Sequence, residues 1–98
     1  EVYDGYPCTK NDERVTKLMK GFATEYLGED KVFGLPARMT SEDFGFFSQE
    51  YPCTFYRFGV IGAQHCTGLH TPTFLIDEES LKTSTGVMTY LAMKYLTE

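Results

Sequence analysis

Apolar residues between positions 15 and 27 recur every three or four residues, which is the spacing of one face of an α-helix. Asn11 precedes this stretch and is predicted as the N-cap, because its side chain can accept hydrogen bonds from the free N–H groups of a first turn. Gly28 follows the stretch and is predicted to end the helix. The apolar stripe consists of Val15, Leu18, Met19, Phe22, Ala23, Tyr26 and Leu27.

A short second helix is predicted between Ser41 and Pro52. Ser41 is a typical capping residue, and the two acidic residues after it suit the positive end of a helix dipole. Phe44 and Phe47 then fall on one face of the helix, which is predicted to end before the proline.

The third predicted helix opens at the acidic run Asp77–Glu79. Gly86 lies inside this helix, where it either weakens it by about 1 kcal/mol relative to alanine or permits close packing. The apolar face of the helix is predicted to comprise Leu81, Val87, Met88, Leu91, Ala92, Tyr95 and Leu96.

Three stretches have the composition of extended chain. Residues 1–10 contain a glycine and a proline, residues 32–35 form a short apolar run, and residues 53–60 are rich in strand-forming residues, with a glycine-containing loop over 61–69. Helices that alternate with such stretches predict an α/β fold with a parallel sheet, here three helices with two or three strands. So few strands leave sheet edges bare, so residues 1–98 are predicted to form one unit that either oligomerises or is a piece of a larger domain.

Composition narrows the possible partners and the compartment. The 98 residues carry a net charge of −5, which disfavours nucleic-acid binding, and no run of apolar residues is long enough to span a membrane. No basic start precedes an apolar stretch, so no leader sequence is expected. The three cysteines, Cys8, Cys53 and Cys66, include no close pair and are interpreted as free thiols of a cytoplasmic protein.

The two histidines are the main candidates for metal chemistry. His65 and His70 share the loop that follows the best predicted strand, and a neutral imidazole is a common metal ligand. Pro72 stiffens the turn after His70, which would help to hold a ligand in place. Either histidine could equally be an ordinary surface or hydrogen-bonded residue. A zinc or nucleophile site that uses Cys66 or Cys53 is disfavoured, because the spacing matches no common motif.

The acidic clusters have a structural explanation as well as a chemical one. Ser41, Glu42 and Asp43 are explained by helix capping, and so is the run Asp77–Glu79. The aromatic residues fit a packed core better than a stacking platform, because no basic groove accompanies them.

Three segments in order along the chain stand out together: Tyr6–Asp12, Met39–Phe44 and Leu69–Leu81. Together they resemble the C-terminal end of the metal-dependent N-acyl-amino-acid amidohydrolases, a family that includes aminoacylase-like enzymes, hippurate hydrolases and auxin-conjugate hydrolases. The resemblance covers nearly all of this chain but only about the last quarter of such an enzyme. It implies a zinc-exopeptidase-like α/β catalytic domain whose N-terminal part and inserted dimerisation or lid domain are absent from this chain.

The resemblance also implies a reaction and its residues. His70, in Leu-His-Thr-Pro, would be one ligand of a centre of two divalent ions, whether Zn, Mn, Ni or Co. The remaining ligands and a general-base glutamate would lie outside this chain, which would therefore be inactive alone. Ser41, Glu42 and Asp43 would have a second-sphere or positioning role. The substrate would be a small N-acyl amino acid or peptide, and the enzyme could be a homo-oligomer.

Two other hypotheses stay open at this point. The chain could be a non-catalytic binding or assembly module of the same fold, as its acidic surface and bare sheet edges would allow. It could also be a small zinc module built from its cysteines and histidines, although the spacing does not favour this.

Overall fold

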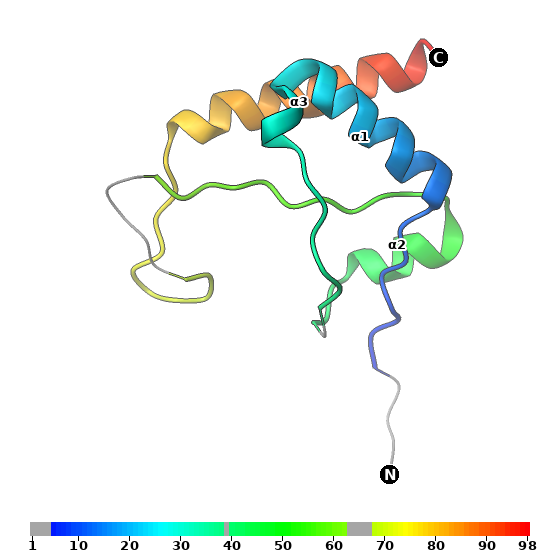
Figure 1. The fold of residues 1–98 in the computed structure, drawn as a ribbon. Helices are drawn as coiled ribbons and strands as arrows, with labels where there is room; N and C mark the ends of the chain where they lie inside the picture. Colours follow the sequence, from blue (N-terminus) through cyan, green and yellow to red (C-terminus); the bar gives the residue numbers. More distant parts are fainter. Residues whose placement is uncertain (1–4, 39, 63–67) are drawn as a thin grey trace.

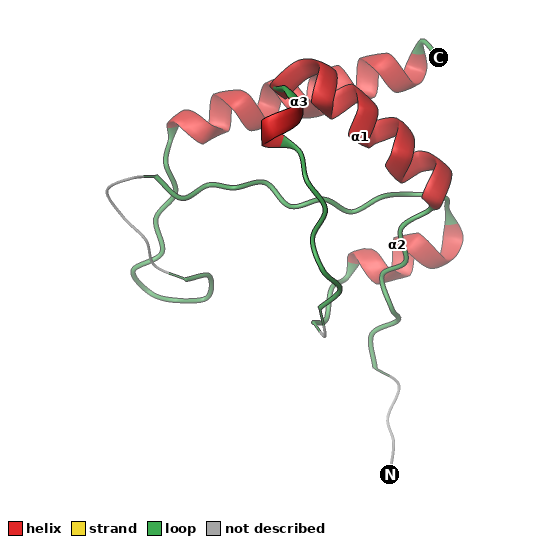
Figure 2. Ribbon diagram, viewed as in Figure 1, coloured by secondary structure: helices red, strands yellow, loops and turns green. Residues whose placement is uncertain are grey.

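The computed structural model describes residues 5–38, 40–62 and 68–98 of the chain. These residues form three α-helices and one short 3₁₀-helix, joined by extended segments and turns (Figures 1 and 2). The elements are, in chain order, α1 (Glu13–Leu27), η1 (Glu29–Lys31), α2 (Phe44–Glu50) and α3 (Glu79–Leu96).

The core of the molecule lies where α1 packs against α3. Phe22 from α1 and Val87 and Leu91 from α3 are buried there and contact one another. The predicted stripe of α1 is confirmed, because most of its members face this core. The partly buried residues around it are Leu18, Met19, Ala23, Leu27, Phe58 and Tyr90.

The ends of α1 confirm one prediction and correct another. Gly28 ends the helix as predicted, with φ 98° and its N–H donated to the Thr24 carbonyl. The N-cap is Asp12 and not Asn11: the Asp12 carboxylate accepts a hydrogen bond of 2.9 Å from the Val15 N–H. Asn11 is engaged elsewhere, and the next oxygen-bearing side chain therefore caps the helix.

The side chain of Asn11 binds the backbone of the extended segment 53–60. Its Oδ1 accepts the N–H of Phe55 at 2.8 Å, and its Nδ2 donates to the Phe55 carbonyl at 3.3 Å. The Asp12 N–H donates to the Cys53 carbonyl at 2.8 Å. The start of α1 therefore holds the first residues of this segment by their backbone.

The predicted α/β class is wrong, because the described residues contain no strand (Figure 2). Residues 53–60 follow an extended path, as their composition predicts, but a strand exists only where a second backbone pairs with it. No hydrogen bond among the described residues involves the backbone of residues 56–59. Residues 32–35 likewise form no strand.

The predicted apolar face of α3 is also wrong as a single face. Val87 and Leu91 point into the core, whereas Leu81, Met88 and Tyr95 are exposed. The exposed three are spaced by seven residues, so they form a second face about 100° around the helix from the first. Among the described residues, this second face has one polar contact, from the Tyr56 hydroxyl to the Met88 sulfur at 3.7 Å.

The chain exposes far more surface than a compact domain of its length. Its accessible surface is 8443 Å², whereas a folded protein of this mass exposes about 5,700 Å². Its radius of gyration is 15.6 Å, against about 13 Å for a compact domain. None of the described helices is long and apolar enough to cross a membrane.

Candidate functional site

His70 lies in a turn between the extended segment and α3. The Thr71 hydroxyl donates to the Gly68 carbonyl at 2.8 Å, and the Phe74 N–H donates to the Thr71 carbonyl at 3.2 Å. The first bond spans His70, and the second closes the next turn, over residues 71–74. The His70 side chain is exposed.

The backbone of His70 has φ 61°, and His70 is the one non-glycine residue with positive φ among the described residues. This left-handed conformation costs an L-residue with a Cβ about 1–2 kcal/mol. Residues held in this way cluster at functional sites, where the fold fixes a side chain in place at the expense of backbone strain. The turn therefore presents an exposed imidazole on a constrained backbone.

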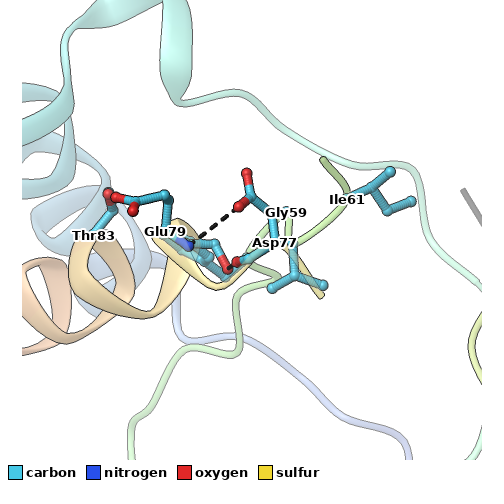
Figure 3. A pocket seen from close by; sticks show the side chains of 8 residues that line it. Gly59, Ile61, Asp77, Glu79 and Thr83 are labelled. Atoms are coloured by element: carbon cyan, nitrogen blue, oxygen red, sulfur yellow. Dashed lines mark hydrogen bonds between the residues drawn. The ribbon is translucent and has the colours of Figure 1, made fainter. Parts of the chain in front are cut away.

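The chain returns from the His70 turn to α3 along a shallow cavity of about 260 Å³ (Figure 3). The Asp77 N–H donates to the Val60 carbonyl at 2.7 Å, which ties the turn to the extended segment. The Asp77 carboxylate accepts the Glu79 N–H at 3.2 Å. The predicted acidic start of this helix is confirmed, because this bond holds the N–H of its first residue. Glu79 and Thr83 complete one wall of the cavity.

Ser41 does not cap α2. The helix begins at Phe44, and the oxygen nearest its N–H is the Glu42 carboxylate at 3.5 Å. The Glu42 carbonyl accepts the Gly45 N–H at 3.0 Å, and the Asp43 carbonyl accepts the next N–H along. The capping explanation therefore fails for Ser41, since residues 42 and 43 already accept the hydrogen bonds of the first turn.

The Asp43 carboxylate is close to a tyrosine from the N-terminal segment. A hydrogen bond to Asp43 and its negative charge raise the pKa of the exposed Tyr6 hydroxyl above 10.0. The Tyr6 ring also meets the Phe46 ring edge-on, with centroids 5.7 Å apart. Tyr6 therefore contacts both the turn before α2 and the helix itself.

The structure does not join His70 to the Ser41–Asp43 turn. No hydrogen bond, ion pair or ring contact connects them in the part of the chain that is described, and they lie in separate loops (Figure 1). Over the same residues, no three side chains of His, Cys, Asp or Glu gather closely enough to hold a metal ion. An exposed imidazole fits a metal as one neutral nitrogen ligand, so a complete centre needs ligands from elsewhere.

The remaining candidates divide into described and undescribed residues. Cys8 and Cys53 are free thiols. His65 and Cys66 lie outside the described residues, so the structure does not test the interpretations that involve them.

The residues that hold α2 against the N-terminal segment were not predicted from the sequence. Gly45 is buried against Pro7, and Ser48 and Gln49 bind the Cys8 carbonyl. Gly45 could have indicated them, because a glycine in the first turn of a helix is typical of a place where another backbone lies close to the helix.

Comparison with known proteins gives the family. Residues 1–94 match peptidase family M20/M25/M40. The chain is 33% identical over 97 residues to IAA-amino acid hydrolase ILR1-like 6 of Arabidopsis thaliana, covering 95% of this chain and 20% of the relative. It is also 33% identical over 94 residues to the uncharacterized hydrolase y4tI of Sinorhizobium fredii, covering 96% of this chain and 22% of that relative. IAA-amino acid hydrolase ILR1-like 5 of Arabidopsis thaliana is 33% identical over 94 residues, covering 93% of this chain and 21% of that relative.

No solved structure matches the chain significantly. The chain spans about a fifth of the length of the curated relatives that it matches. The match over residues 1–94 takes in the N-terminal segment, the turn before α2, the His70 turn and nearly all of α3. The chain therefore belongs to peptidase family M20/M25/M40.

Proposed function

We propose that this chain is part of a metal-dependent amidohydrolase that hydrolyses the amide bond of N-acyl amino acids or small peptides. Membership of peptidase family M20/M25/M40 supports hydrolysis, and relatives named IAA-amino acid hydrolases support an amide that carries an amino acid. The observation that carries the proposal is the exposed His70 on a left-handed backbone in a closed turn.

His70 has the role of one neutral nitrogen ligand in a centre of two divalent ions. Such a centre supplies a hydrolytic water at neutral pH and stabilises negative charge on the amide oxygen. The chain's own part is to fix the imidazole: the bond from Thr71 to Gly68 closes the turn, and Pro72 restricts the backbone of the residue before it.

The Ser41–Asp43 turn has a positioning role in the complete enzyme, although it lies in a separate loop from His70 in this chain. Its three side chains are exposed, and two of them are carboxylates that can accept hydrogen bonds from a substrate or from a ligand side chain. The carbonyls of Glu42 and Asp43 accept hydrogen bonds from the first turn of α2, so the backbone that carries these two carboxylates is constrained.

The other metal ligands and the general base come from a part of the enzyme outside this chain. The surface of the chain supports this, since about 2,700 Å² more is exposed than in a compact domain of its mass. The second face of α3 belongs to this surface, and so do residues 56–59, whose backbone has no hydrogen-bond partner among the described residues. The chain alone is therefore expected to be inactive.

The test compares this chain with a longer protein that carries it. The longer protein is expected to release amino acid from N-acetyl or N-benzoyl amino acids, to lose activity with a chelator and to regain it with Zn²⁺ or Mn²⁺. The pure 98-residue chain is expected to release none. Hydrolysis by the pure chain, or chelator-resistant hydrolysis by the longer protein, would overturn the proposal.

A second candidate is a binding or assembly module without catalysis. The exposed apolar side chains of α3 favour it, because faces of this kind commonly meet a partner. In that case the longer protein would bind N-acyl amino acids without hydrolysing them. Turnover that requires His70 would exclude it.

A further inference from the structure

The position of α2 is not set by the helical core. α2 has seven residues and packs against neither α1 nor α3. Figure 1 shows it beside the N-terminal segment, apart from the other two helices. A helix of two turns has no stable position of its own, so other segments must hold it. One contact is between the Phe44 ring of α2 and the Phe55 ring of the extended segment, with centroids 5.2 Å apart.

Residues 6–10, here called the strap, contact α2 through both hydrogen bonds and a ring contact. The Gln49 amide donates to the Cys8 carbonyl at 3.2 Å. The Ser48 hydroxyl lies 3.4 Å from the same carbonyl, and it donates over the shorter distance of 2.7 Å to the Gly45 carbonyl within α2. The Lys10 N–H donates to the Ser48 hydroxyl at 3.3 Å. With the contact between Tyr6 and Phe46, the strap touches successive turns of α2.

Gly45 is where the strap and α2 lie closest. It is buried, and a Cβ at this position would lie 2.5 Å from the Pro7 carbonyl oxygen and 3.3 Å from its carbon. Those atoms are backbone, so they could not move aside without shifting the whole strap. The contact therefore requires the absence of a side chain at position 45.

The same glycine is bonded to the turn that carries the proposed positioning residues. Its N–H donates to the Glu42 carbonyl at 3.0 Å. A movement of α2 relative to the strap would thus carry residues 42 and 43 with it and would separate Asp43 from Tyr6.

We infer that Gly45 is a positioning residue: by letting the strap lie directly on α2, it fixes the Ser41–Asp43 turn where the hydrolytic reaction needs it. This inference rests on the proposed function. It adds a residue that contacts neither metal nor substrate and acts through the turn.

The test is Gly45→Ala in the longer protein that carries this chain, with Gly21→Ala as the matched control. Gly21 also lies inside a helix but has open space where a Cβ would stand, so both variants gain the helix propensity of alanine, about 1 kcal/mol. Gly45→Ala is expected to lower kcat about 100-fold, the scale of a 1 Å misplacement. Helix content, KM and bound metal should stay unchanged. Gly21→Ala should keep wild-type kcat.

Wild-type kcat in Gly45→Ala would overturn the inference. So would equal losses in both variants. If Gly45→Ala does not fold, the double variant Ser48→Ala and Gln49→Ala takes its place, since it removes the hydrogen bonds of these two side chains to the strap. It must lower kcat at least several-fold at unchanged KM, or the inference fails. A wild-type protein without any hydrolysis would instead refute the proposed function, and the inference with it.

Discussion

The left-handed backbone of His70 allows its chemical role to be separated from a structural one. Glycine at position 70 removes the imidazole and also the Cβ that makes φ 61° costly. Alanine removes the imidazole but keeps the Cβ. The two substitutions therefore have the same effect on metal binding and different effects on stability.

The expected difference follows from two opposing terms. Relief of the left-handed conformation favours glycine by about 1–2 kcal/mol. The greater freedom of glycine in the unfolded chain opposes it by about 0.4–1 kcal/mol. His70→Gly should thus be about 1 kcal/mol more stable than His70→Ala when both proteins are free of metal.

The assay is urea unfolding of the metal-free longer protein, beside hydrolysis of N-benzoyl amino acids with metal restored. Both variants should lose more than about 100-fold in kcat/KM, beyond the usual cost of an outer-shell residue. The glycine variant should unfold at higher urea than the alanine variant.

Two results would refute this reasoning. Activity within tenfold of wild type in either variant would show that the imidazole is not a ligand. A glycine variant less stable than the alanine variant would show that the turn stores no strain at His70.

The remaining predictions concern the packing of α1 on α3. A Cβ at Gly86 would collide with the Tyr26 hydroxyl, and moving that ring breaks its 5.1 Å contact with Tyr90, worth about 0.5–1.5 kcal/mol. By urea unfolding, the free energy of unfolding of Gly86→Ala should therefore be about 1 kcal/mol lower than that of Gly21→Ala. Equal values in the two variants would contradict the close approach of Gly86 to Tyr26. The hydrogen bond from Tyr90 to Glu25 raises the pKa of Tyr90 above 10.0. The bond therefore stabilises the fold below pH 10, and this contribution is lost as pH rises through the raised pKa. Above pH 10, the free energy of unfolding should fall less with pH in Tyr90→Phe than in the wild type. An equal fall in the two proteins would exclude a stabilising role for this hydrogen bond.

The helices could be predicted because each is specified by local chemistry. The stripe of α1 and the glycine that ends it depend on spacing and on φ alone, and both are confirmed. The acidic start of α3 is specified by neighbouring residues in the same way.

The sequence could not show that the described residues form no strand, because a strand depends on a partner that its own sequence does not specify. Residues 53–60 have a strand-like composition, yet one residue of this segment, Phe55, is bonded on both backbone groups, and its partner is the side chain of Asn11. The same interaction explains the misplaced N-cap, since Asn11 cannot bind the extended segment and cap the helix at once.

The sequence proposes residues for the candidate site but not their arrangement in space. The resemblance indicated His70 and the Ser41–Asp43 turn. The positive φ of His70, however, occurs in a turn whose hydrogen bonds, between residues 68 and 74, cannot be predicted from the residue types. The contact of Gly45 with Pro7 joins residues 38 apart in the sequence, so it could be recognised only in the fold.

Calorimetric titration with Zn²⁺ tests the central claim most directly. The longer protein is expected to bind two ions, and His70→Gly is expected to weaken or abolish binding of at least one of them. The 98-residue chain alone is expected to bind weakly and without dependence on His70. Binding to the longer protein that is unchanged in His70→Gly would contradict the account. So would tight stoichiometric binding to the chain alone that His70→Gly abolishes, because the chain would then hold a complete site of its own.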